Sequence, residues 1–137
     1  MSEWLDDSTP PEGAPTVRVI AMPADANPYG DIFGGWLMSQ MDLAAGSIAS
    51  RHSRGRAVTI AVEGMHFHLP VSVGDEVSVY AALTRVGRTS MTIAVEAWRR
   101  HRHEDAMHKV TQASFTFVAI DAERNSRPVP AMEGARA

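Results

Sequence analysis

Residues Gly34 to Arg51 read GGWLMSQMDLAAGSIASR, and almost every side chain in this segment is apolar or small. The segment has no Lys, Glu or Arg before Arg51, and it places a single carboxylate, Asp42, in its middle. Because an exposed helix stripe normally carries such charged residues, the pattern predicts a long helix that is covered on nearly all sides.

Asp42 is the exception in this segment. A carboxylate loses solvation among apolar residues, and Asp is a poor helix former, so some other interaction should offset both costs. One explanation is a functional role for Asp42. The other is a small, solvated helix stripe, since four residues recur at helical spacing: Gly35, Ser39, Asp42 and Gly46. Composition and spacing leave both explanations open.

Length and composition narrow the class of protein. The 137 residues suit one domain with a real core, and 45% hydrophobic residues argue against disorder. The absence of Cys removes disulfides, thiolate nucleophiles and Cys-based metal sites, and it favours an intracellular, cytoplasmic location. Residues 1–15 are acidic and Pro-rich, without the pattern of a signal peptide, and are expected to be a flexible tail.

Neither a membrane nor nucleic acid is an expected partner. No run of about 18 apolar residues exists, which argues against a membrane-spanning helix. The formal net charge of −3 gives no general attraction to nucleic acid. The basic run from Trp98 to His103 is interpreted as a solvated strand end and turn.

Strand patterns surround the helix. A short strand is expected at Val17 to Met22, then a turn-rich segment from Pro23 to Gly30, the helix, and a central strand at Val58 to Phe67. In this strand, Val58, Ile60 and Val62 are expected on one face and Thr59, Ala61 and Glu63 on the other. Three more strands are expected at Glu76 to Arg85, Ser90 to Arg99 and Lys109 to Ile120. The order predicts an α+β fold, an antiparallel sheet of about five strands with one helix on one face.

One sheet cannot cover a helix that is apolar nearly all round. The remaining helix surface therefore calls for a partner, and a symmetric homodimer is the simplest one.

Four motifs give the chain a specific resemblance: NPYGDIFGGWLMSQMD (Asn27 to Asp42), VTIAVEGMHF (Val58 to Phe67), PVSVGD (Pro70 to Asp75) and VGRTS (Val86 to Ser90). Together they resemble the YciA-like acyl-CoA thioester hydrolases of the hot-dog fold, over most of the chain. The resemblance implies a long central helix wrapped by the sheet, and an enzyme that hydrolyses acyl-CoA to a free acid and CoA without metal or cofactor. The expected domain spans residues 16–121, with a C-terminal tail at residues 122–137.

The resemblance also implies catalytic residues. Asp42 would act as the general base on water or, in a debated variant, as the nucleophile, and a partly desolvated carboxylate can accept a proton from water. The oxyanion would be bound by N–H groups at the helix start, where Gly34 and Gly35 place no Cβ in the way of the acyl group. Asn27 would orient water or bind the carbonyl through its side-chain amide.

The CoA portion of the substrate is expected at the turn formed by Gly87, Arg88, Thr89 and Ser90. Arg88 can offer a fork to phosphate, and the turn's hydroxyl and N–H groups can donate to pyrophosphate or pantetheine oxygens. Without the other motifs, a Gly-containing hairpin turn with polar residues would be the preferred explanation.

Helix geometry predicts how the site is assembled. Gly35 and Asp42 are seven residues apart, so they lie about 10 Å apart along a helix that rises ~1.5 Å per residue. One thioester carbonyl cannot touch both, so the two groups should come from two protomers, with two equivalent composite sites per dimer. Similar proteins often assemble further into hexamers, as trimers of dimers.

Two other function classes are compatible with this fold. A hot-dog hydratase or dehydratase would need a His near the helix start, and this helix has none before His52. A non-catalytic acyl-CoA sensor would keep the turn around Arg88 but would not need Asp42. His66 and His68 alternate on one strand, but two His without a third ligand are a weak metal signal, and no metal site is expected.

Overall fold

The computed structural model describes residues 9–132. Its elements follow one another along the chain as β1 (Val17–Ile20), the short 3-10 helix η2 (Pro23–Asp25), α1 (Gly34–Ser53), β2 (Ala57–Glu63), β3 (Glu76–Val86), β4 (Ser90–Arg100) and β5 (Met107–Ala119). The predicted element order is confirmed, and α1 is two residues longer than expected.

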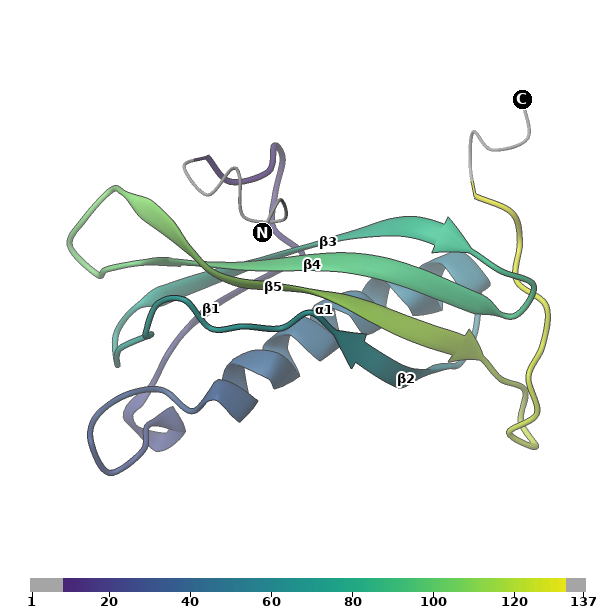
Figure 1. Ribbon diagram of the computed structural model, residues 1–137, viewed down its shortest axis with the longest axis horizontal. Helices are drawn as coiled ribbons and strands as arrows, with labels where there is room; N and C mark the ends of the chain where they lie inside the picture. The colour runs from purple at the N-terminus through teal and green to yellow at the C-terminus, as the bar shows by residue number, and fades with distance from the viewer. Residues whose placement is uncertain (1–8, 133–137) are drawn as a thin grey trace.

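The five strands form one antiparallel sheet in the order β1-β3-β4-β5-β2. Figure 1 shows the curved sheet wrapped around α1, which crosses one face diagonally, while the segment before β1 lies over the opposite face. Three long strands, β3, β4 and β5, are joined by two hairpins and form the centre of the sheet. Their inward-facing side chains and one side of α1 make the core.

The helix buries one side and leaves another uncovered. Small and long apolar residues on the buried side pack against the sheet: Leu37, Met41, Ala44, Ala45 and Ala49. In contrast, Leu43 is 63% exposed and Met38 is 38% exposed. The expectation of a helix covered on nearly all sides therefore fails for one chain alone, because the sheet reaches only part of the helix surface.

The prediction for β2 was wrong in three respects. This strand pairs only with β5, so it is an edge strand and not a central one. It ends at Glu63, because Gly64 turns the chain with a φ of +76°. A bulge between Thr59 and Ala61 also breaks the alternation, so Val58 and Val62, paired with Val118 and Phe115, face opposite sides of the sheet.

The interpretation of the basic run from Trp98 to His103 was wrong for its first residue. Trp98 is fully buried on the sheet face opposite α1, where it pairs with Ser78 and Lys109. Its Nε1 donates to Glu96 at 2.9 Å, and Nζ of Lys109 lies 5.9 Å from its ring centroid. The end of the run does lie in an exposed turn, at Arg102 and His103.

Two further expectations concern the ends of the chain and membranes. Residues 1–8 of the expected N-terminal tail and residues 133–137 of the C-terminal tail lie outside the described residues. Among residues 9–132, no helix is long and apolar enough to cross a membrane.

Candidate active site

Asp42 lies half-buried in the middle of α1, with its side chain toward the edge strand β2. The hydroxyl of Thr59 on β2 donates a 2.5 Å hydrogen bond to Oδ1 of Asp42. No hydrogen bond to Oδ2 of Asp42 occurs among residues 9–132, so this oxygen can accept a proton from a water molecule. In one chain Gly35 and Ser39 of the small helix stripe are exposed and Asp42 and Gly46 are half-buried, so the stripe is partly solvated, and the contact with Thr59 is an additional feature of Asp42.

Thr59 is a site residue that sequence reasoning missed. A Thr in a strand satisfies ordinary β-propensity and gives no signal of its own. Its position opposite Asp42 follows from the pairing of Thr59 with Phe117, whose ring belongs to the core on the helix side of the sheet. The contact between Thr59 and Asp42 could therefore have been predicted only from the register of β2 against β5.

The start of α1 has unpaired backbone donors. The N-cap residue Phe33 provides no side-chain cap, and its carbonyl accepts from Trp36 at 3.1 Å and Leu37 at 3.3 Å. The N–H groups of Gly34 and Gly35 have no acceptor within the described part of the chain. Such donors, with the positive end of the helix dipole, form an anion-binding position.

The two glycines at the helix start differ in their surroundings. A Cβ at Gly34 would come within 3.3 Å of the Phe67 ring, whereas a Cβ at Gly35 would meet no atom within 4 Å. Gly34 therefore gives room to the protein's own aromatic ring, and Gly35 faces open space from which an acyl group can approach.

Asn27 lies in the loop before the helix start, and its side chain is half-buried. Its Oδ1 accepts from the N–H groups of Tyr29 at 2.9 Å and Asp31 at 3.1 Å, which holds the loop closed. The amide orientation is fixed by these two donors, so only Nδ2 points away from the loop contacts as a donor. This arrangement suits binding of a carbonyl oxygen and does not suit accepting a proton from water.

Within one chain, α1 separates these groups. Asp42 and Gly35 belong to one continuous helix, at about 10 Å apart along its axis for ~1.5 Å per residue. Gly34 and Gly35 therefore lie at the start of α1, after the loop that carries Asn27, and the structure of one chain does not bring Asp42 to them.

The turn from Gly87 to Ser90 joins β3 and β4 at the other end of α1 (Figure 1). The N–H of Gly87 donates to the carbonyl of Ser90 at 2.8 Å, and a Cβ at Gly87 would come 2.6 Å from Oγ of Ser90. The carbonyl of Thr89 accepts from Ala119 at 3.0 Å, while the side chain of Arg88 is exposed. The turn thus has a fixed main chain and presents its arginine to solvent.

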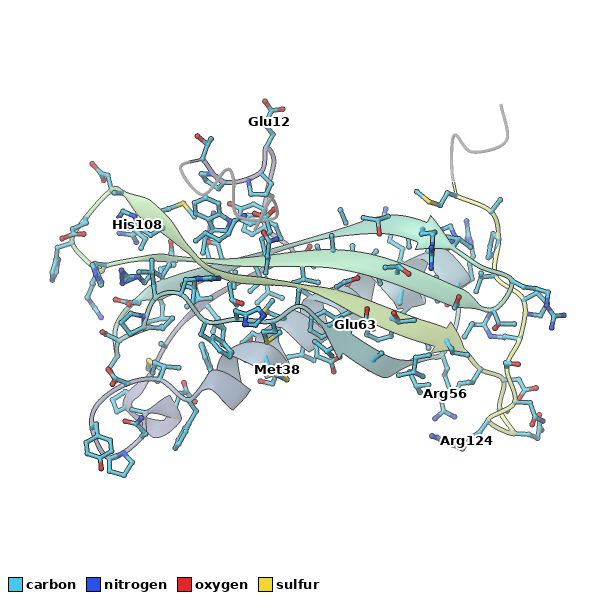
Figure 2. The ribbon with its side chains drawn as sticks, viewed as in Figure 1. Glu12, Met38, Arg56, Glu63, His108 and Arg124 are labelled. Carbon is cyan, nitrogen blue, oxygen red and sulfur yellow. The ribbon has the colours of Figure 1, made fainter. Side chains whose placement is uncertain are left out.

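Other candidates are weaker. The rings of His66 and His68 lie 6.5 Å apart, and among residues 9–132 no group of three or more His, Cys, Asp or Glu could hold a metal ion. An open hollow of about 430 Å³ lies at the beginning of β3, away from Asp42, and its lining residues are Ile20, Met22, Gly74, Arg100 and Arg102. Figure 2 shows Met38 on the helix face below the sheet, near the centre of the molecule.

Comparison with known proteins identifies the family of this chain. Residues 29–106 match the model of the Thioesterase superfamily. The chain is 54% identical to an uncharacterised acyl-CoA thioester hydrolase of Zymomonas mobilis, over 96% of this chain and 89% of that protein. It is 46% identical to the acyl-CoA thioester hydrolase YciA of Salmonella typhimurium, over 90% of this chain and 95% of that protein.

A solved structure shows the same fold. The hexameric thioesterase of Yersinia pestis superposes with a TM-score of 0.83 at 44% identity, covering 89% of this chain and 99% of the other. The predicted hot-dog fold is confirmed. From its sequence, its fold and these relatives together, the chain belongs to the YciA-like acyl-CoA thioester hydrolases of the Thioesterase superfamily.

Proposed function

We propose that this protein hydrolyses acyl-CoA thioesters to a free carboxylic acid and CoA, with Asp42 as the residue that activates water. The observation that carries the proposal is the half-buried carboxylate of Asp42, held by Thr59 at 2.5 Å in the middle of a helix whose other residues before Arg51 are nearly all apolar or small. The names of the curated relatives support the same reaction.

The chemistry assigns a role to each group. Asp42 takes a proton from water, whose oxygen attacks the thioester carbonyl carbon, and the carbonyl electrons move onto its oxygen. The N–H groups of Gly34 and Gly35, with Nδ2 of Asn27, stabilise this oxyanion. When the carbonyl re-forms, the C–S bond breaks, and the leaving CoA sulfur takes up the proton held by Asp42, which restores the carboxylate. In the alternative course, Asp42 attacks the carbonyl itself, the C–S bond breaks and the CoA thiolate leaves, and water then hydrolyses the resulting mixed anhydride to the free acid and the Asp42 carboxylate.

A homodimer is the minimal active unit in this proposal. Asp42 of one helix faces the helix start and Asn27 of the partner protomer, because one chain keeps these groups apart. Apolar side chains on both elements beside Asp42 support an interface there: Leu43 is 63% exposed on α1, and Ile60 is 58% exposed on the edge strand β2. The hexameric Yersinia pestis relative suggests a trimer of dimers as the full assembly.

The CoA moiety is assigned to the turn of Gly87, Arg88, Thr89 and Ser90. The exposed guanidinium of Arg88 can pair with phosphate oxygens, and Thr89 and Ser90 contribute hydroxyl groups. The proposed reaction uses no metal or cofactor. The proposed compartment is the cytoplasm, because disulfides are rare there and this chain has no Cys to form them.

The test is release of free CoA thiol from acyl-CoAs of increasing chain length by the native protein and Asp42→Asn. Asn keeps the shape of Asp but cannot accept the proton, so we expect kcat to fall by about 10³-fold or more, with the melting temperature unchanged. Asp105→Asn, which neutralises an exposed acid in the β4–β5 turn, is the matched control and should keep native activity.

The same assay separates the alternatives. Binding of acyl-CoA without hydrolysis by the native protein would favour a sensor, and addition of water to an enoyl-CoA without thiol release would favour a hydratase. Equal rates for the native protein and Asp42→Asn would remove Asp42 from the mechanism.

A further inference from the structure

The chain after β5 returns across the end of α1. Residues 121–132, here called the C-terminal strap, run from the end of β5 past the C-terminus of α1 to the β3–β4 turn (Figure 1). It is hydrogen-bonded to other parts of the fold at two points: in its middle, the N–H of Arg127 donates to the carbonyl of Ala119 at 3.0 Å, and near its end the carbonyl of Pro130 accepts from Nε2 of His52 at 2.8 Å. The strap is therefore attached to the sheet and to the helix.

The guanidinium of Arg127 is the centre of this attachment. It donates to the carbonyl of Ser53 at 2.8 Å, the carbonyl of Ile120 at 2.9 Å and the carbonyl of Arg56 at 3.1 Å. It also lies 3.3 Å from Oγ of Ser53. A positive group at the C-terminal end of a helix satisfies carbonyls that lack a partner in the helix and complements the dipole.

Gly55 lies directly beside the guanidinium of Arg127. A Cβ at Gly55 would collide with Nη2 of Arg127. Gly55 is not among the residues with positive φ, so backbone conformation does not require a glycine here. Its missing side chain makes room for the guanidinium.

Beyond Arg127, the strap reaches the turn to which we assign the CoA moiety. The N–H of Val129 donates to the carbonyl of Arg88 at 3.0 Å, and the Val129 side chain packs against the core. On its other side, the turn is held by the bond from Ala119 to the carbonyl of Thr89. The main chain of Arg88 is thus fixed by the strap, while its side chain stays exposed.

The geometry points to Arg127 as a positioning residue for CoA: by anchoring the strap to the end of α1, it sets the main chain of Arg88 and so aims the Arg88 guanidinium at the CoA phosphates. This inference rests on the proposed function. Arg127 itself does not touch the substrate, because its guanidinium donates to protein carbonyls.

The test compares Arg127→Gln with Arg124→Gln. Both changes remove one positive charge from the same strap, but Arg124 is exposed and no side-chain hydrogen bond of it appears in the described part of the chain. Each variant is assayed with one acyl group on two carriers: CoA, and N-acetylcysteamine, which keeps the thioester but lacks the nucleotide and all phosphates. Gly55→Ala is added because its Cβ displaces the guanidinium without changing any charge.

We expect Arg127→Gln and Gly55→Ala each to raise KM for acyl-CoA about tenfold, with kcat and the rate on the N-acetylcysteamine thioester close to native. Arg124→Gln should leave KM unchanged. Equal losses of rate on both carriers would mean that Arg127 supports the fold only. Equal increases of KM for Arg124→Gln and Arg127→Gln would mean that the charge of the strap attracts CoA without any positioning. Either result overturns the inference.

The inference and the proposed function can fail separately. If Arg88→Gln raises KM for acyl-CoA but Arg127→Gln and Gly55→Ala do not, the CoA assignment stands and the strap has no positioning role. If the native protein hydrolyses no thioester on either carrier, the proposed function fails and the inference fails with it.

Discussion

Thr59 donates its hydroxyl to one carboxylate oxygen of Asp42 and leaves the other oxygen for water. The bond fixes the carboxylate plane, and hydrogen bonds to charged groups contribute about 1.5–3 kcal/mol when they are well placed. If the same contact holds Asp42 in its productive orientation, loss of the hydroxyl should appear in kcat.

Thr59→Val removes the hydroxyl at nearly constant shape, and Thr59→Ser retains it. We expect Thr59→Val to lower kcat about 10- to 100-fold with little change in KM, since ~1.5–3 kcal/mol of orientation is lost, and Thr59→Ser to keep most activity. Steady-state kinetics and thermal melting of both variants provide the measurement. A native kcat for Thr59→Val would show that the protein holds Asp42 without Thr59.

At the scale of elements, α1 shows why part of the site could be predicted from sequence. Asp42 in an apolar helix and a glycine pair at a helix start both depart from local preferences, so each stands out in one sequence. Thr59 obeys its local preference, and its role depends on a contact between residues seventeen positions apart. Such a contact depends on register and cannot be predicted from composition.

The edge strand β2 shows where prediction of the fold failed. Its β-branched residues indicated a central strand, yet Ile60 is 58% exposed at the edge of the sheet. A β-branched pattern predicts a strand that is buried, but it does not say which neighbour buries it, and in one chain β2 has a neighbour on one side only. The bulge after Thr59 could not be predicted from the sequence of β2 either, because it is set by the pairing with β5.

The helix start gives a prediction at the same scale. Gly35→Ala adds a methyl group that meets no atom of its own chain, and Ala is about 1 kcal/mol more favourable than Gly inside a helix. We therefore expect an unchanged or higher melting temperature together with a kcat that falls at least about tenfold, because the methyl group blocks the approach to the N–H donors. Thermal melting and thiol release on one preparation would test this, and a native kcat would place the oxyanion elsewhere.

In the mechanism that we propose, a single chain of the whole molecule is an incomplete enzyme. The helix α1 carries the proposed base in the middle and the proposed oxyanion donors at the start, and a rigid helix does not bend to bring them together. A two-fold axis that places the start of each helix opposite the middle of the other would bring the two groups together with no additional element, and this is the arrangement that we propose. The same arrangement would bury apolar residues that one chain leaves exposed, such as Leu43.

Mixed dimers test this arrangement directly. Asp42→Asn and the bulkier Gly35→Val should each be inactive as homodimers, because each destroys both composite sites. When equal amounts of the two variants are dissociated and reassociated at random, half of the dimers are mixed. Each mixed dimer has one of its two sites free of both substitutions. About a quarter of all sites are then intact, so about a quarter of native activity should return. If each site used groups from one chain only, every site in the mixture would carry a substitution and activity would stay absent. The recovered fraction of kcat at saturating substrate, with subunit exchange checked by mass spectrometry, therefore distinguishes a shared site from a self-contained one.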